Sequence, residues 1–234
     1  GSFEYTAQFG TDSVTTNSGD GNVFVAKISS NGAWRWVNQP DGQNVQGAYS
    51  SGTSIVVDNN DEAYVTGYFH RNLYFTNGDA LMWTGDDDIF IAKISTLGYW
   101  LWATMAGGTQ GDDHANSIAV GPDGNLFLTG YYQFTATFGS DSLTSDQGST
   151  DAFVAKISPF GNWYFAQSMG GSSTDIGHSI AVNSQGNVYV VGSFYNSMDF
   201  SWNVSVSGSG GVSNSFIAKG NDNGSIMPWY WAEK

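Results

Sequence analysis

Hydrophobic positions in this chain fall in short runs separated by glycine turns. Residues 117–120 (Ser-Ile-Ala-Val) precede the turn at 121–124 (Gly-Pro-Asp-Gly), and a second apolar run follows at 125–130. Two such runs on either side of a tight turn predict a β-hairpin. No segment carries an apolar stripe of helical period that is long enough to indicate a helix.

Further strands are predicted after this hairpin. In residues 151–157 the side chains of Phe153, Ala155 and Ile157 share one face, and another strand begins at Trp163. Residues 131–139 are expected to be extended, and the polar residues 141–150 are expected to form a loop. Because the four main strands are close in sequence, antiparallel pairing of neighbours satisfies their backbone groups.

This unit is repeated along the chain. The pattern Asx-x-Phe-Val/Ile-Ala-Lys recurs four times, with its lysines at positions 27, 93, 156 and 219, so the spacings are 66, 63 and 63 residues. We therefore predict an all-β chain, a β-propeller-like radial array of four-stranded antiparallel blades with about three and a half repeats of 63–66 residues. The expected single repeat domain, 1–234, divides into a partial first repeat (1–40) and three further repeats (41–103, 104–166 and 167–234).

The repeated segments resemble a known family. Residues 179–190, with the strand at 151–157 and the Gly170-Gly171 pair before Asp175, look like the bacterial and archaeal SBBP-type β-propeller repeat, and the first two strands are similar to NHL repeats. The resemblance implies a secreted or cell-surface protein and brings no catalytic residues. An insertion carrying Phe9, Phe75 and Phe138 lengthens each unit beyond an ordinary blade of about 40 to 50 residues.

The number of units is a further prediction. Closed propellers usually have about 4 to 8 blades, so three and a half blades leave strand edges that invite association. The chain also opens inside a repeat, because residues 1–24 align without gaps on residues 130–153. We expect either self-association, as a homo-oligomer or filament, or a longer parent chain.

The charge and composition of the chain limit the classes of partner that it can bind. The net charge of −14 argues against nucleic acid and against docking on anionic lipid, and no run approaches the length of a membrane span. The chain has no cysteine, which excludes disulfide and thiol chemistry. Because four of the seven basic residues are the repeat lysines, we interpret these lysines as structural cations beside acidic neighbours.

Aromatic residues offer one set of candidate ligand contacts. Each repeat carries a pair of large rings two residues apart, as in Trp100 and Trp102, which either packs blades together or forms a platform for sugar rings. Trp83 and Trp202 lie outside this pattern, in insertions, and are the better ligand candidates. His70 and Arg71 complete the candidate ligand-binding set.

Carboxylates offer a second set. Acidic residues close together in sequence mark either a solvated loop or a hard cation such as calcium. The spacing of an EF-hand loop is absent, so both interpretations stay open. The candidate calcium ligands are Asp86, Asp87, Asp88, Asp112 and Asp113.

These observations favour a non-enzymatic extracellular or cell-surface module for binding, adhesion or assembly. The alternatives are a lectin-like carbohydrate-binding module, with a glycan as partner, and a carbohydrate-active hydrolase. Glycoside hydrolysis needs two facing carboxylates, and the sequence alone does not identify such a pair. No other catalytic motif is present.

Overall fold

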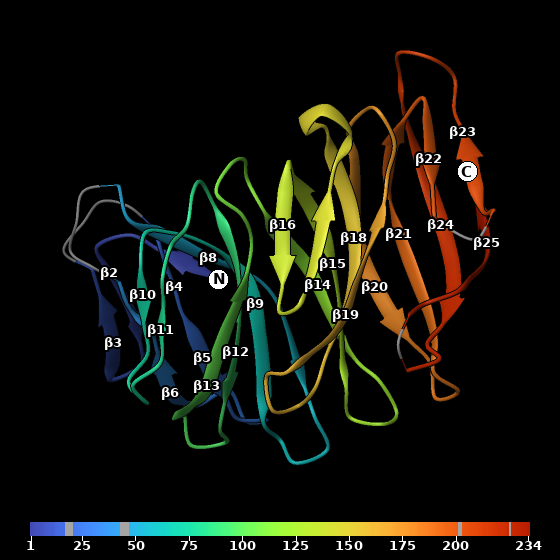
Figure 1. Cartoon of the computed structure of the whole chain (residues 1–234). Coiled ribbons are helices and arrows are strands. Elements are labelled where there is room, and N and C mark those ends of the chain that lie inside the picture. Colours follow the sequence, from blue (N-terminus) through green and yellow to red (C-terminus); the bar gives the residue numbers. More distant parts are fainter. Residues whose placement is uncertain (17–20, 43–46, 201–202, 225) are drawn as a thin grey trace.

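The chain is described by a computed structural model that covers residues 1–16, 21–42, 47–200, 203–224 and 226–234. In these residues the structure is all β, with no α-helix and one short 3-10 turn at Asp146–Gly148. None of their helical segments is long and apolar enough to cross a membrane. The sheets stand side by side in chain order, from the blue end to the red end of an open row (Figure 1). The predicted all-β, blade-like architecture is confirmed.

Three of the sheets are four-stranded antiparallel meanders, named here blades 2, 3 and 4. Blade 2 contains β8 (Tyr49–Val57), β9 (Ala63–His70), β12 (Asp88–Ile94) and β13 (Trp100–Ala106). Blade 3 contains β14 (His114–Val120), β15 (Leu126–Gln133), β18 (Thr150–Ile157) and β19 (Trp163–Met169). Blade 4 contains β20 (Asp175–Val182), β21 (Asn187–Tyr195), β24 (Ser213–Asn221) and β25 (Trp229–Glu233).

The N-terminal end of the row is a partial blade, named blade 1. Its β5 (Val25–Ile28) pairs with β6 (Trp34–Asn38), and its β1 (Ser2–Phe3) pairs with β4 (Asn22–Val23). The short β7 (Asp41–Gly42) begins the second repeat and pairs with β10 (Leu73–Tyr74) of that repeat. Three complete blades and one partial blade are therefore present among the described residues.

Each second strand contains a glycine where the first strand bulges toward it. In blade 3 the register between β14 and β15 shifts after Ala115, and a Cβ added to Gly130 would lie 1.9 Å from the carbonyl oxygen of His114. Only glycine fits so close to a backbone oxygen. Blades 2 and 4 have equivalent glycines. A Cβ added to Gly67 would lie 1.8 Å from the carbonyl oxygen of Ser51, and one added to Gly192 would lie 2.1 Å from that of Ile176.

Between its second and third strands every repeat inserts a β-hairpin. The hairpins pair β2 (Thr6–Phe9) with β3 (Asp12–Thr15), β10 (Leu73–Tyr74) with β11 (Ala80–Leu81), β16 (Thr135–Phe138) with β17 (Asp141–Thr144), and β22 (Ser197–Asp199) with β23 (Ser205–Ser207). The loop expected over residues 141–150 is therefore wrong for Asp141–Thr144. This segment pairs with β16 and buries Leu143, a single apolar residue among polar ones whose alternation is too short to reveal a strand.

The hairpins cover the outer edge of the blades. The carboxylate of Asp141 in β17 accepts a hydrogen bond from the Ala166 amide of β19 at 3.0 Å, and Asp79 accepts one from the Ala103 amide of β13 at 2.8 Å. Both amides lie on the outermost strand, where a neighbouring sheet would otherwise pair. Exposed strand edges favour aggregation, so the inserted hairpin protects the blade.

A phenylalanine and a tryptophan fasten each hairpin to its blade. In blade 3 the rings of Phe138 and Trp163 meet edge to face at 5.4 Å, and Phe138 is almost fully buried. The first member of each aromatic pair thus packs inside its own repeat, rather than between blades as expected. The equivalent pairs, at 5.0, 5.0 and 5.5 Å, are Phe9–Trp34, Phe75–Trp100 and Phe200–Trp229.

The second member of the pair does contact the next blade. The Nε1 atom of Trp36 donates a hydrogen bond to the carbonyl of Thr96 at 3.0 Å, and Trp102 donates one to the carbonyl of Pro159 at 3.0 Å. Each accepting carbonyl lies in the turn between the third and fourth strands of the following blade. The predicted packing between blades is therefore confirmed for the second residue of the pair, as in Trp36 and Trp102.

We expect the substitution Phe138→Ala to lower the free energy of unfolding by about 3 to 5 kcal/mol, because it removes a buried ring and leaves a cavity under the hairpin. The loosened hairpin also exposes the edge of β19, so the variant should self-associate more than the native chain. Thermal unfolding and light scattering measure the two effects. The substitution Phe134→Ala, at an exposed ring close in sequence, serves as the control, and equal losses in both variants would contradict the fastening role.

Candidate functional site

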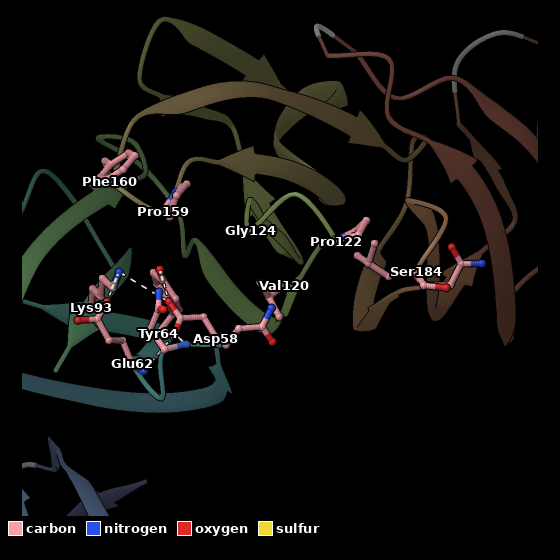
Figure 2. Close-up of a pocket in the computed structure, with 15 residues that line it drawn as sticks. Asp58, Glu62, Tyr64, Lys93, Val120, Pro122, Gly124, Pro159, Phe160 and Ser184 are labelled. Atoms are coloured by element: carbon pink, nitrogen blue, oxygen red, sulfur yellow. Dashed lines mark hydrogen bonds and ion pairs between the residues drawn. The ribbon is translucent and has the colours of Figure 1, made fainter. Parts of the chain in front are cut away.

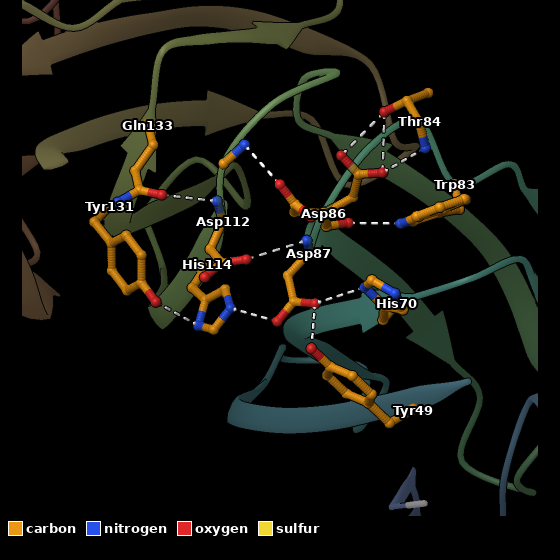
Figure 3. Close-up of polar contacts among 12 residues, drawn as sticks. Tyr49, His70, Trp83, Thr84, Asp86, Asp87, Asp112, His114, Tyr131 and Gln133 are labelled. Carbon is orange, nitrogen blue, oxygen red and sulfur yellow. Dashed lines mark hydrogen bonds and ion pairs between the residues drawn. The ribbon is translucent and has the colours of Figure 1, made fainter. Parts of the chain in front are cut away.

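Asp87 lies at the centre of a polar cluster between blades 2 and 3 (Figure 3). Its Oδ1 atom accepts hydrogen bonds from the Tyr49 hydroxyl at 2.5 Å and from Nδ1 of His70 at 3.1 Å. Its Oδ2 atom accepts one from Nε2 of His114 at 2.9 Å. Tyr49 and His70 lie on β8 and β9, whereas His114 begins β14, so one buried carboxylate joins two blades.

The cluster keeps this carboxylate ionised. Burial alone would raise the pKa of Asp87, but the hydrogen bonds from His114 and Tyr49 outweigh burial and hold the pKa below its ordinary value. An ionised carboxylate only accepts, so both imidazoles donate to it. Nδ1 of His114 is hydrogen-bonded to the Tyr131 hydroxyl at 2.9 Å, and burial raises the pKa of Tyr131 to about 12.

Hydrogen-bonded Asp and His side chains are typical of general-base sites. Here, however, the aromatic rings are packed too closely to admit a substrate. The ring of Tyr68 stacks on His114 with centroids 3.7 Å apart, and the ring of Tyr49 stacks on His70 with centroids 5.2 Å apart. The arrangement therefore acts as a polar joint between blades.

The predicted ligand residues gather on the blade 2 side of this cluster. The guanidinium of Arg71 lies 4.5 Å from the centre of the Trp83 ring, and the rings of His70 and Trp83 are 5.1 Å apart. The Nε1 atom of Trp83 donates to the carbonyl of Asp86 at 2.6 Å. Packing thus occupies one face of Trp83, which was not apparent from sequence. Trp202 lies outside the described residues.

The candidate calcium ligands do not share one centre. The carboxylate of Asp87 is surrounded by Tyr49, His70 and His114, whereas that of Asp88 accepts from the amide and hydroxyl of Thr84. Asp86 accepts from the Gly111 amide at 3.0 Å. Among the described residues, no group of three or more acidic, histidine or cysteine side chains could hold a metal ion. Calcium binding by this set stays a prediction.

Thermal unfolding with and without calcium tests that prediction directly. A cation that binds only the folded chain raises the melting temperature with its concentration. Calcium binding by the acidic set would raise the melting temperature above its value in a chelator, whereas the separate partners of these carboxylates lead us to expect agreement within about 1 °C. A larger rise that Asp112→Asn abolishes would show that the acidic residues rearrange around a bound ion.

Asp88 and Asp113 instead form a buried pair between blades 2 and 3. Both are fully buried, and a Cβ added to Gly107 would lie 2.0 Å from Oδ1 of Asp88 and 3.2 Å from Oδ2 of Asp113. That Asp113 oxygen has no hydrogen-bond partner. Burial raises the pKa of Asp88 to about 6, and burial together with the Asp88 charge raises that of Asp113 to about 8.

The same arrangement recurs between blades 3 and 4. Asp151 and Asp175 are both buried; Asp151 lies against Gly170, a Cβ added to Gly171 would lie 3.8 Å from Oδ2 of Asp175, and that oxygen also has no partner. Burial raises the pKa of Asp151 to about 6, and burial with the Asp151 charge raises that of Asp175 to about 7. Blade 1 has Asn22 at the position of Asp88, and blade 2 has Ser50 at the position of Asp113, so the first interface contains no such pair. Sequence reasoning missed the pairing, although the repeated Asx and Gly-Gly positions were its signal.

A groove lies at the opposite ends of the strands, where turns of blades 2, 3 and 4 meet (Figure 2). Its volume is about 590 Å³. Lys93 lies at its blade 2 side, where its Nζ atom is 2.6 Å from Glu62 and 3.8 Å from Asp58. Phe160, which is 78% exposed, lies at its blade 3 side. Sequence reasoning did not identify this groove, because its residues come from turns of three repeats.

The ion pairs of Lys93 confirm its predicted structural role beside acidic neighbours. The equivalent Lys156 is confirmed as well, because it is paired with Asp222 of blade 4 and lies 3.4 Å from Asp123. Lys219 lies 5.6 Å from the centre of the Tyr189 ring. The predicted role therefore holds for two of the four repeat lysines among the described residues.

Comparison with known proteins bears on the fold. Residues 164–193, which run from β19 through β20 into β21, match the SBBP beta-propeller repeat. The chain carries an SBBP repeat. This confirms the resemblance drawn from the sequence, and the four-stranded sheets agree with it. The match begins in the last strand of blade 3 and ends in the second strand of blade 4, so it crosses the interface between two blades.

A curated relative points to the same class of fold. An uncharacterized WD repeat-containing protein of Acanthamoeba polyphaga mimivirus is 27% identical over 236 aligned positions, covering 79% of this chain. The chain spans only 17% of the length of that protein. The repeat match and this relative together support a propeller-repeat scaffold.

Proposed function

We propose that this chain is a non-catalytic propeller-repeat module that binds proteins, including further copies of itself. The observation that carries the proposal is a row of apolar side chains on the outer strands. Leu101, Tyr164 and Tyr230 occupy the same position on blades 2, 3 and 4, and are 43%, 50% and 57% exposed. Blade 1 has Arg35 at this position.

A β-bulge turns these side chains outward. In every repeat the residue between the two aromatic positions has no partner in the register, as where Ile94 pairs with Trp100 and Lys93 with Trp102, which leaves Leu101 unpaired. An extra residue in a strand redirects its side chain, and bulges at sheet edges commonly serve recognition. Exposed apolar patches mark protein-interaction sites, and a row of such side chains along neighbouring blades supports binding at these positions, which the hairpins leave exposed.

The charge of the chain sets the conditions for self-association. A net charge of −14 makes copies repel at low ionic strength, and added salt screens that repulsion. We expect light scattering to show oligomers whose average mass rises with protein concentration and with salt. A monomer at every concentration and salt level would contradict assembly.

A triple variant, Leu101→Ser, Tyr164→Ser and Tyr230→Ser, tests the surface itself. It replaces three exposed side chains, of which Tyr164 contacts a buried residue, its ring lying 5.4 Å from Nζ of Lys156. The melting temperature should therefore fall little, and the oligomers should dissociate. Leu97→Ser, at a turn residue that is 72% exposed, is the matched control and should leave assembly intact. Unchanged assembly in the triple variant would exclude the row as the contact surface.

We also propose an extracellular or cell-surface location and a role in adhesion. The support is the resemblance to SBBP repeats, together with a chain that needs no reduced thiol. Protease treatment of intact cells, followed by detection with an antibody, should remove the protein if it is displayed outside. Protection in intact cells and cleavage only after lysis would contradict this location.

A further inference from the structure

We propose that the groove between the turns of blades 2, 3 and 4 is a binding site for a neutral oligosaccharide. The site is separate from the outer row of apolar side chains, and the proposal does not depend on protein binding by that row. Its volume of about 590 Å³ lies within the range of about 300 to 1,000 Å³ that is usual for small-molecule sites.

One difference between repeats explains why the groove is open. At the interface of blades 3 and 4, Asp222 reaches from blade 4 to Lys156 of blade 3. The position equivalent to Asp222 in blade 3 is Pro159, which cannot form an ion pair with Lys93. Lys93 therefore turns to Glu62 of its own blade. The gap between blades 2 and 3 is left without the ion pair that connects the next two blades.

The polar side of the groove is rigid. Oδ1 of Asp58 accepts hydrogen bonds from the amides of Asn60 and Glu62 at 2.8 and 3.1 Å, and Oδ2 accepts one from the Tyr64 hydroxyl at 3.1 Å. Burial opposes ionisation, but these hydrogen bonds and Lys93 hold the pKa of Asp58 below its ordinary value. The donors and acceptors that face the groove are thus fixed before a ligand arrives, which lowers the entropic cost of binding.

The apolar side fits the carbon-bound hydrogens of a sugar ring. Phe160 presents an exposed ring at the rim, and Pro122 and Pro159 also line the groove (Figure 2). Sites that combine an aromatic surface with a few fixed polar groups hold ligands by one apolar face and orient them by hydrogen bonds. A pyranose has both an apolar face and a rim of hydroxyls.

The charge of the groove favours neutral sugars over anionic ones. Two acidic side chains, Asp58 and Glu62, surround the single lysine of the groove, and the whole chain has a net charge of −14. Anionic sugars are therefore disfavoured. Asn60 and Asn183, which also line the groove, supply neutral amide groups of the kind that bind hydroxyls. A neutral, hydroxyl-rich ligand matches this set.

The test measures binding of cellotetraose, mannotetraose and chitotetraose by titration calorimetry, after a screen of neutral glycans on an array. We expect at least one neutral glycan to bind, and Phe160→Ala to weaken it about tenfold. Leu97→Ala is the matched control, because Leu97 is the equivalent turn residue of blade 2, is exposed, and does not line the groove. It should leave the affinity unchanged.

A second variant tests the geometry. Pro159→Asp places a carboxylate where Asp222 lies in blade 4, so it should pair with Lys93, close the groove and abolish binding while the chain stays folded. A blank array, binding of peptides but of no neutral glycan, or glycan binding that survives both Phe160→Ala and Pro159→Asp would each overturn the proposal. None of these results bears on assembly through Leu101, Tyr164 and Tyr230.

Discussion

Replacing Asp113 by asparagine is expected to stabilise the protein at pH 8, by on the order of 3 kcal/mol, which corresponds to a rise of roughly 6 to 12 °C in melting temperature. Asp113 is fully buried beside Asp88, and its Oδ2 atom has no hydrogen-bond partner. Asparagine keeps an acceptor for the Gln133 amide, which donates to Oδ1 at 3.1 Å, and its NH₂ group can donate toward Asp88. Ionisation next to a second carboxylate is then avoided.

The pH dependence of stability follows from the same residues. The pKa values of Asp88, Asp113, Asp151 and Asp175 are raised in the folded chain to about 6, 8, 6 and 7, from an ordinary value of 3.8. Between pH 4 and 8 the unfolded chain thus binds fewer protons than the folded chain, and stability falls as the pH rises. Above about pH 8 this loss is complete.

Other carboxylates oppose this trend at low pH. The pKa values of Asp58, Asp87 and Asp123 are lowered in the folded chain, because their hydrogen bonds and charged neighbours outweigh burial. Their contribution is present above the ordinary pKa of 3.8 and is lost as the pH falls through the lowered values. We therefore expect the highest melting temperature at about pH 4 to 5.

Thermal scans of the native chain, Asp113→Asn and Asp61→Asn across this pH range measure these effects. Asp61 is an exposed acid in a turn, and its variant should reproduce the native pH profile. Asp113→Asn should flatten the decline between pH 4 and 8. If Asp113→Asn destabilises the chain at pH 8 and leaves the slope unchanged, the carboxylate is ionised in the folded chain and contributes to stability there.

The substitution Gly130→Ala is expected to lower the free energy of unfolding by about 3 kcal/mol or more. Its Cβ atom would lie 1.9 Å from the carbonyl oxygen of His114, which belongs to the adjacent strand and cannot move without breaking the ladder. The loss should be similar at the equivalent glycines of blades 2 and 4, which meet backbone oxygens in the same way.

Gly124→Ala is the comparison that separates the steric clash at Gly130 from the cost of placing a non-glycine residue in the left-handed conformation. Gly124 has φ of +80°, but a Cβ there would have nothing within 4 Å, so its cost is limited to about 1 to 2 kcal/mol for the left-handed conformation. Urea unfolding of both variants gives the comparison. Equal losses at Gly124 and Gly130 would mean that the bulge of the first strand relaxes away from the second.

Much of the candidate site was out of reach of the sequence because it depends on contacts between repeats. Asp87 was identified as an acidic loop residue, but its partners Tyr49, His70 and His114 come from three strands of two blades. Trp83 differs, because Arg71 packs on its ring from within the same repeat, and the turn that brings them together is a tertiary feature of the insertion. Asp87 and His114 are far apart in the sequence, and the packing of blade 2 against blade 3 brings them into contact.

Sequence patterns alone predict the strands, the period and the blade, because each blade is built from neighbouring segments whose apolar alternation and glycine turns act locally. They also locate the insertion, but not the hairpin in it, since Asp141–Thr144 buries only Leu143 and reads as polar. Contacts between elements show which carboxylates are paired and that the hairpins cover the blade edges. They also show that Pro159 leaves a groove open, whereas Asp222 at the equivalent position connects the next two blades. These features depend on burial and on distances between repeats, which a local pattern does not contain.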